Sequence, residues 1–184
     1  MKAKQLFVIA PFLFLACGSP EPVIEVSPLD GEVCIGEAAE VLGGLAPVDD
    51  PALLQEALGK SGEGKLCFGR VYAATESVIV YRVWNAAKSY TEFGKWWSLT
   101  PPIGTVADYR RDNAICPEWS DLNQLTRCTI KKGSHVVIGT GQSATCMAMM
   151  YGKSPVHQVY MANDTRVNML QVEGCKQLGA WPLM

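Results

Sequence analysis

Runs in which apolar and polar residues alternate fill most of the chain beyond residue 65 and predict β-strands. The two longest are "LCFGRVYAA" at 66–74 and "SVIVYRVWNA" at 77–86, both rich in the β-branched and aromatic residues that strands favour. Shorter runs of the same kind predict further strands at 95–100, 128–130, 135–138, 156–163 and 168–178. Short connections between these runs, such as the Lys132-Gly133 turn, favour a mostly antiparallel sheet.

The part of the chain before these runs has a helical pattern. "IGEAAEVLGGLA" at 35–46 and "DDPALLQEALGK" at 49–60 predict two short helices. In the second, Asp50 is the expected N-cap, Pro51 takes the first helical position and Gly59 is the expected stop. The expected fold is therefore α+β, with short N-terminal helices followed by a mostly antiparallel sheet region.

Composition narrows the class of protein. The chain has 184 residues, 48% of them hydrophobic and 18% charged, which is typical of one globular domain. The formal net charge is −2, so there is no electrostatic reason to expect nucleic acid or an anionic membrane surface as a partner.

The first residues have the layout of a signal peptide. Lys2 and Lys4 give it a positive start, and the apolar stretch 6–16 is too short to span a bilayer. This stretch ends in "FLAC", which resembles the cleavage box of bacterial lipoproteins, where the cysteine becomes the lipid-modified N-terminus. Residues 1–16 are thus expected to be removed and Cys17 to carry lipid, while an ordinary secretory signal cleaved nearby is the alternative.

The residues around this cysteine bear on location. Phe14 departs from the Leu usual in the lipoprotein box, and Gly18 stands where an Asp would resemble an inner-membrane retention signal. The expected location is the bacterial cell envelope, lipid-anchored at the outer membrane or surface. Residues 17–33 contain three prolines and predict a tether, so the single domain is expected at 34–184.

Cysteine usage agrees with export. If Cys17 carries lipid, six cysteines remain, an even number that can close three disulfides in an oxidising compartment. The six are Cys34, Cys67, Cys116, Cys128, Cys146 and Cys175. The sequence does not fix their connectivity, and pairing of neighbours along the chain (34–67, 116–128, 146–175) is the working assumption. No CxxC pair exists and the spacings fit no zinc site, so no metal is expected.

Two polar side chains occur in apolar strands. Alternation places Arg82 on the same face as Val78 and Val80, where a guanidinium needs an anion or several acceptors. It either reaches solvent or a nearby acid, or holds a phosphate with its planar fork. Gln158 must likewise find partners within the sheet or face a cleft.

The segment "FGKWWSLTPP" at 93–102 is the third candidate. Gly94 allows backbone conformations closed to other residues, and Ser98 adds a hydroxyl on the same strand face as Trp96. Trp96 and Trp97 point to opposite faces, so at most one can face any cleft, and each is more often a core residue than a ligand platform.

Together these segments resemble the ADP-ribosyltransferase and NAD glycohydrolase superfamily, especially secreted bacterial toxin domains related to the tuberculosis necrotizing toxin. The resemblance covers about residues 70–165, and its order and spacing are more specific than each short motif. It rests on Tyr81-Arg82-Val83, on Gly94 to Ser98 with Pro101, on Gly133 to Gly139, and on Gln158-Val159-Tyr160. It implies a split, mostly antiparallel sheet core of ADP-ribosyltransferase type.

The resemblance implies cleavage of the nicotinamide–ribose bond of NAD, with NAD as substrate and no other cofactor. Arg82 would bind a phosphate or the nicotinamide ribose, Ser98 would support the site, and Gln158 would orient the ribose or the attacking water. Trp96 or Trp97 would form a wall for the nicotinamide. The other NAD-binding positions implied are Tyr81, Gly94 and Arg110.

"DYRRDNAICPEWSD" at 108–121 leaves two interpretations open. Arg110 and Arg111 could add phosphate contacts and Tyr109 could stack on a ring, or the four acids in this segment could neutralise the arginines in a solvated loop.

Two departures from the family matter. Transferases that modify arginine carry an acidic pair near the last motif, whereas this chain has Val156 and the neutral Gln158. Hydrolysis of NAD is therefore favoured over transfer to a protein acceptor. Six cysteines are also unusual for a toxin domain that acts in a reducing cytosol, which favours a domain that stays outside the cell. An acceptor or an immunity protein stays a possible partner.

Two other functions remain open. One is a non-enzymatic, disulfide-rich surface lipoprotein that acts as a binding module with its tryptophans in the core. The other is a ribonuclease-like toxin in which His135 and His157 act as acid and base with Lys131 or Lys132.

Overall fold

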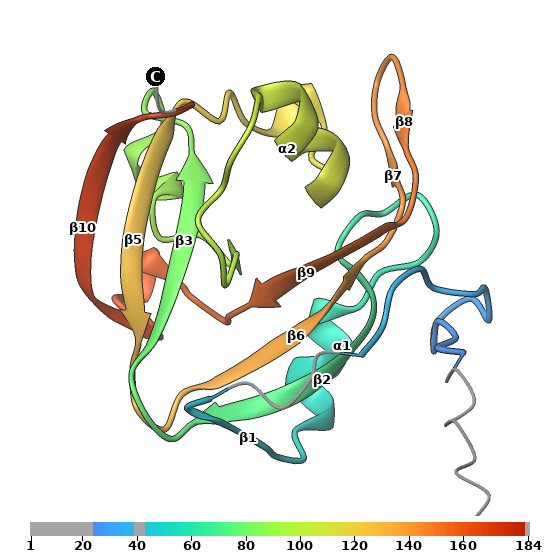
Figure 1. The fold of residues 1–184 in the computed structure, drawn as a ribbon, viewed down its shortest axis with the longest axis horizontal. Helices are drawn as coiled ribbons and strands as arrows, with labels where there is room; N and C mark the ends of the chain where they lie inside the picture. The colour runs from blue at the N-terminus through green and yellow to red at the C-terminus, as the bar shows by residue number, and fades with distance from the viewer. Residues whose placement is uncertain (1–23, 39–42, 183–184) are drawn as a thin grey trace, which may run out of the picture.

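The computed structural model describes residues 24–38 and 43–182, and its fold is α+β with mostly antiparallel strands (Figure 1). The five-stranded sheet has the order β1-β2-β6-β9-β4: β1 (Leu45–Pro47), β2 (Leu66–Ala74), β6 (His135–Gly141), β9 (Ser154–Tyr160) and β4 (Trp96–Trp97). The three-stranded sheet has the order β10-β5-β3: β10 (Val172–Ala180), β5 (Gln124–Ile130) and β3 (Val78–Trp84). A separate hairpin joins β7 (Ala144–Thr145) to β8 (Met150–Tyr151).

Helices are few in the described part of the chain. The α-helices there are α1 (Pro51–Ala57) and α2 (Val106–Asn113), and short 3-10 turns occur at η1 (Ser89–Thr91), η2 (Pro117–Trp119) and η3 (Thr165–Val167). No helix among the described residues is long and apolar enough to cross a bilayer. The predicted strands from 66 to 178 are confirmed, with β2 matching its predicted range residue for residue.

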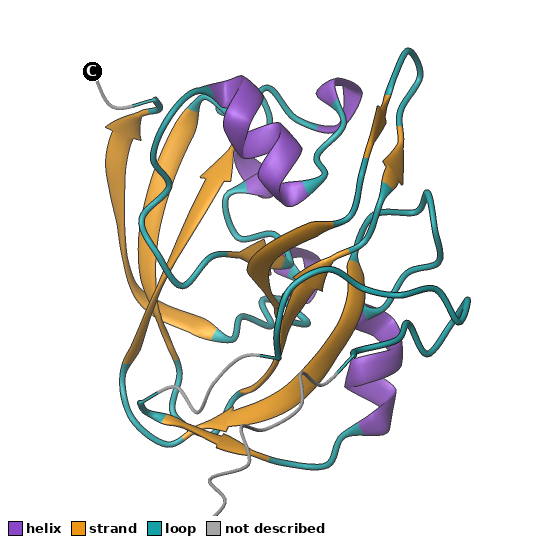
Figure 2. Cartoon of the chain, turned by 45° about the vertical axis from the view of Figure 1, so that its right-hand side comes forward, coloured by secondary structure: helices purple, strands orange, loops and turns teal. Residues whose placement is uncertain are grey.

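The two sheets pack face to face around the main hydrophobic core. This core lies between them and contains Val80 and Ile130 of the three-stranded sheet and Tyr72, Ile138 and Val159 of the five-stranded sheet. The sheets are close at the β5–β6 connection and diverge at the other end, where α2 lies (Figures 1 and 2).

Helix α1 covers the outer face of the five-stranded sheet. Asp50 is its N-cap as predicted, because the carboxylate accepts a hydrogen bond from the Leu53 backbone N–H at 3.1 Å. Pro51 takes the first position, and the helix ends at Ala57, before the predicted stop. Leu53 and Ala57 pack on that face of the sheet, so burial of this apolar side holds the helix in place.

The other predicted helix, at 35–46, is wrong where the structure describes it. Residues 35–38 are irregular, 39–42 lie outside the described residues, and Leu45 and Ala46 belong to β1. Gly44 has a left-handed backbone with φ of +81°, which ends any helical path immediately before the strand.

Helix α2 falls where the sequence suggested a solvated loop. A capping box starts it: Thr105 Oγ1 accepts from the Asp108 N–H at 3.1 Å, and the Asp108 carboxylate accepts from the Thr105 N–H at 3.3 Å. Ala114 ends it in the left-handed conformation. The interpretation in which nearby acids neutralise the arginines is confirmed for Arg111, which forms ion pairs of 2.9 Å with Asp108 and with Asp112.

The disulfides confirm one predicted pairing and correct two. Cys34–Cys67 is present as assumed, but the other bonds are Cys116–Cys146 and Cys128–Cys175. The neighbour rule fails because strand pairing decides which cysteines meet. β10 runs antiparallel beside β5, with Lys176 opposite Arg127, and this brings Cys175 to Cys128.

The N-terminal predictions lie partly outside the described residues. The signal peptide at 1–16, Cys17 and the tether up to residue 23 lie outside the described residues. Residues 24–35 fold back on themselves in a ribbon with Val26 opposite Val33. The Cys34–Cys67 bond fixes this ribbon to β2.

Candidate functional site

One cavity of about 180 Å³ lies where α2 bridges the diverging sheets. It is lined by Lys65, Arg82, Val83, Trp96, Trp97, Tyr109, Asn113, Ala114, Ile115, Trp119, Ser120, Leu122 and Gln158. Residues from all three candidate segments of the sequence therefore meet here: Arg82 from β3, Trp96 and Trp97 from β4, and Gln158 from β9. None of the residues lining it is acidic.

Arg82 lies on the inner face of its sheet, as alternation predicted. Val80 on the same face is fully buried in the main core, and Arg82 is half-buried at the point where the cavity begins. Its Nε donates to the Thr91 carbonyl at 2.8 Å, and its Nη1 donates to the Trp96 carbonyl. These two hydrogen bonds hold the plane of the guanidinium in one orientation.

The charge of Arg82 has no counter-charge nearby. Within residues 24–38 and 43–182, no carboxylate lies within 4.0 Å of it, although six ion pairs form elsewhere. Burial lowers the pKa of Arg82 to about 10, so the side chain stays cationic at neutral pH. A partly buried cation held only by carbonyl groups gains stability from an anion that enters the cavity. Nη2 makes no hydrogen bond to the described residues and remains available for such an anion.

Gly94 makes the position of Arg82 possible. A Cβ placed on Gly94 would collide with Arg82 Nη2 and lie 2.6 Å from Cζ. The guanidinium therefore packs directly on the Gly94 backbone. Gly94 does not itself line the cavity, but no larger residue fits there without moving Arg82.

The two tryptophans of β4 pack into different clusters, as predicted, but the expectation that at most one of them could face a cleft is wrong, because both line the cavity. Trp97 is buried in the core between the sheets and donates from Nε1 to the Gly94 carbonyl at 2.8 Å. Trp96 is half-buried and meets the Tyr160 ring edge-on, with ring centroids 5.0 Å apart. Both residues line the cavity, and the Trp96 carbonyl also binds Arg82.

Gln158 is only 6% exposed and its side chain is oriented by the fold. Nε2 donates to the Asn113 carbonyl at the end of α2, at 3.3 Å. A Cβ on Gly141 of the neighbouring strand would lie 2.9 Å from this Nε2, so Gly141 leaves room for the amide. The described residues provide no hydrogen bond to Oε1, which stays available as an acceptor.

Four predicted site residues are not in the lining, namely Tyr81, Gly94, Ser98 and Arg110. Ser98 is buried and donates to the Thr100 carbonyl at 3.0 Å, while its backbone pairs with Tyr81. Burial raises the pKa of the phenol of Tyr109, a residue that lines the cavity, and the Ser98 hydroxyl lowers this pKa in part. Arg110 turns away and donates to the carbonyls of Cys116 and Ser120.

Several lining residues were not predicted as parts of the site, and Tyr109 was given only as one of two open interpretations of its segment. Tyr109 and Asn113 belong to α2, and the Thr105-x-x-Asp108 capping box was the signal that could have revealed that helix. Burial raises the pKa of the Tyr109 phenol, which is therefore neutral. Trp119 and Lys65 come from loops, and no local pattern places them at this cavity.

Trp119 forms a flat surface at this site. It is 48% exposed, and a Cβ on Gly64 would lie 3.2 Å from its ring, so the Gly64 backbone supports one part of the indole. Lys65 follows Gly64, is exposed and has a left-handed φ of 67°. The lining thus combines two cations, two amides and several aromatic rings.

The histidines do not form a joint site. His135 Nδ1 lies 2.9 Å from the Asp50 carboxylate, and His157 Nε2 lies 2.9 Å from the Glu37 carbonyl. His157 pairs with Thr140, five residues along β6 from His135, which is about 16 Å of strand. Neither histidine lines the cavity, and this argues against the ribonuclease interpretation.

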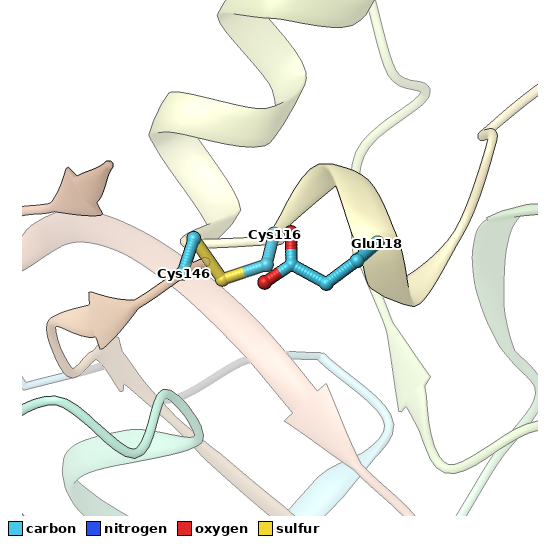
Figure 3. Close-up of side chains that lie close together, drawn as sticks. All are labelled: Cys116, Glu118 and Cys146. Carbon is cyan, nitrogen blue, oxygen red and sulfur yellow. A yellow bond between two sulfur atoms is a disulfide. The ribbon is translucent and has the colours of Figure 1, made fainter. Parts of the chain in front are cut away.

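Cys116, Cys146 and Glu118 lie close together but have other roles than metal binding (Figure 3). The two sulfurs form a disulfide, and the Glu118 carboxylate accepts a hydrogen bond from the Met147 N–H at 2.8 Å. These contacts join the loop that carries Trp119 to the β7–β8 hairpin.

The arrangement can bind an anionic ligand with a planar ring. It offers a fixed guanidinium, an oriented amide and aromatic walls, but no carboxylate to serve as a general base. No protein-family model, no curated protein and no solved structure was found to match this chain.

Proposed function

We propose that this protein cleaves the nicotinamide–ribose bond of NAD. The observation that carries the proposal is the cavity in which Arg82, without any acidic partner among the described residues, meets Gln158. Trp96 and Trp97, which the resemblance also suggests, line the same cavity, whereas Tyr81, Gly94, Ser98 and Arg110 do not. Two packed antiparallel sheets that diverge around this point also suit a split core of ADP-ribosyltransferase type.

The chemistry needs no strong acid or base. Nicotinamide leaves a cationic ring as a neutral molecule, and the ribose passes through an oxocarbenium-like state. Positioning and electrostatics can supply most of the acceleration. In this proposal Arg82 holds the diphosphate, and Gln158 Oε1 accepts from a ribose hydroxyl or from the attacking water.

The cavity size suggests how the dinucleotide is placed. At about 180 Å³ it is smaller than pockets that enclose a whole drug-sized ligand, which start at about 300 Å³. In our proposal the nicotinamide ribose end enters the cavity, and the adenosine half stays outside near Trp119 and Lys65.

Hydrolysis is favoured over transfer to a protein. Residue Val156, where arginine-modifying transferases carry an acid, has an apolar side chain and is not in the lining. A neutral Gln158 cannot deprotonate a nucleophilic side chain. Water is therefore the proposed acceptor.

The test is nicotinamide release from NAD by the oxidised protein. Gln158→Ala is expected to lower the rate by about 10²-fold or more, because an oriented hydrogen-bonding group is lost at the reacting centre. Gln55→Ala is the matched control, since Gln55 is exposed on α1, and it should leave the rate unchanged. Folded, oxidised wild-type protein that releases no nicotinamide would contradict the proposal.

Gly94→Ala provides an independent check. The added methyl group must push Arg82 out of its place, and such a displacement costs about 10²-fold in rate. Gly152→Ala is the control, because a Cβ there meets no atom within 4 Å. The measurement is again nicotinamide release, and equal rates for both variants would show that the position of Arg82 is irrelevant to the reaction.

A binding module without activity is the second candidate. It is favoured by the two carbonyl groups that already accept from Arg82, and by a cavity too small for a whole dinucleotide. Calorimetry that detects NAD binding without nicotinamide release would support this candidate.

We also propose that the chain is anchored in the cell envelope by lipid on Cys17. The support is the lipoprotein-like "FLAC" sequence after a short apolar stretch. Mass spectrometry of the envelope fraction should give a lipid-bearing N-terminal peptide that begins at Cys17. Cys17→Ser should abolish the modification.

A further inference from the structure

The described chain begins with a two-stranded ribbon, residues 24–35, that has two chemically different faces. Val26 pairs with Val33, the Ser27 N–H donates to the Glu32 carbonyl at 2.8 Å, and the Cys34 N–H donates to the Glu25 carbonyl at 3.0 Å. This antiparallel register also sets Ile24 opposite Ile35.

The outer face of the ribbon is aliphatic. Side chains alternate along each strand, so residues two apart share a face. Four exposed side chains form this outer face: Ile24 (71% exposed), Val26 (47%), Val33 (60%) and Ile35 (50%). A contiguous aliphatic surface of this kind marks a docking site, unlike single scattered apolar residues.

The inner face of the ribbon is fixed to the domain. Ser27 and Cys34 are buried there, Cys34 is bonded to Cys67, and Leu29 packs near α1. Asp30 accepts from the Ser61 N–H at 2.7 Å. The ribbon lies at the edge of the molecule (blue in Figure 1), so its aliphatic face is presented as part of a rigid body.

We propose that this aliphatic face docks on the lipid bilayer to which the protein is anchored. The proposal rests on lipid attachment at Cys17, and on the chain between that residue and the ribbon. Six residues, 18–23, separate Cys17 from the ribbon, and a segment of this length reaches at most about 20–25 Å, so the ribbon lies within that distance of the lipid.

The chemistry of the face suits lipid better than a protein partner. It is purely aliphatic, whereas protein interfaces concentrate their binding energy in Trp, Tyr and Arg. The segment 24–37 carries four acidic residues, Glu25, Asp30, Glu32 and Glu37, of which Asp30 accepts from the Ser61 N–H and Glu32 pairs with Lys153 at 3.0 Å. Zwitterionic lipid is therefore the preferred surface, because anionic headgroups would be repelled.

Docking would also orient the cavity. Asp30 ties the ribbon to the loop at 61–65, whose last residue, Lys65, lines the cavity. Docking of the ribbon on the bilayer would then fix the direction in which the cavity opens relative to the membrane.

The test is hydrogen–deuterium exchange of the lipid-bearing chain in phosphatidylcholine vesicles. Amides of residues 24–36 should exchange about tenfold more slowly than in the unlipidated Cys17→Ser chain in solution. The distant segment 165–170 should not change. Equal exchange in the ribbon with and without vesicles, in protein whose lipid is verified by mass, would overturn the proposal.

The variant Ile24→Ser/Val33→Ser/Ile35→Ser should lose the slowing while it keeps the lipid. Ile103→Ser/Val167→Ser is the control, since both residues are exposed elsewhere. Slowing that survives the triple variant means that another face docks. Slowing that appears in the unlipidated chain at high concentration without vesicles means that a second copy covers the face. Either result overturns the proposal, whereas absence of lipid in the mass spectrum rejects the anchor itself.

Discussion

Arg82→Ala is expected to reduce nicotinamide release by about 10²–10³-fold, the usual cost of losing one fixed electrostatic contact at a reacting centre. The cavity would lose the half-buried cation that is proposed to hold the diphosphate, and Lys65 at the surface cannot replace it. Initial rates with NAD, at saturating and at low concentration, would separate loss of binding from loss of the chemical step.

Arg82→Lys sharpens this test. A lysine keeps the charge, but it lacks the planar fork that donates to Thr91 and Trp96 at the same time. The Arg82→Lys variant should therefore recover only a small part of the wild-type rate of nicotinamide release. Arg166→Ala is the matched control, because that side chain is 86% exposed and pairs only with Asp164. A full rate in Arg82→Ala would exclude this cavity as the site of reaction.

The second large effect concerns stability. Removing the Cys128–Cys175 disulfide with Cys128→Ala/Cys175→Ala should lower the free energy of unfolding by about 4 kcal/mol, because the bond closes a loop with a sequence separation of 47. β10 is an edge strand whose pairing with β5 shifts register twice, and most of its residues are exposed. It therefore depends on this bond more than a regular strand would.

Urea denaturation of the oxidised protein would measure the loss. The control is wild-type protein with all three disulfides verified by mass. A decrease below about 1 kcal/mol would mean that the β5–β10 pairing alone holds the strand.

The sequence predicted strands correctly where the two-residue alternation of apolar and polar side chains matches the alternation of buried and exposed side chains in the sheet. β2 and β3 have the alternating pattern, and the position of Arg82 on the inner face follows from alternation with Val78 and Val80. Helix α2 was missed because its sequence, "VADYRRDN", is mostly polar and its apolar contacts come from only a few residues. Its capping box was a local signal that could be recognised.

Other features depend on contacts between distant segments. Cys128 meets Cys175 only through the register of β5 and β10, which chain order does not reveal. Likewise, Lys65 and Trp119 reach the cavity from separate loops, and only the fold brings them beside Gln158. A single sequence carries no local pattern for either arrangement.

The Cys116–Cys146 bond has a consequence for the cell that makes the protein. It holds the loop that carries Trp119, and hence one wall of the cavity, against the β7–β8 hairpin. In the reducing cytosol this bond does not form, so a chain that is exported, as we propose, gains a fixed cavity wall only after it leaves the cytosol. If NAD is the substrate, oxidation after export acts as a safeguard, because the producing cell's own NAD never meets the finished site.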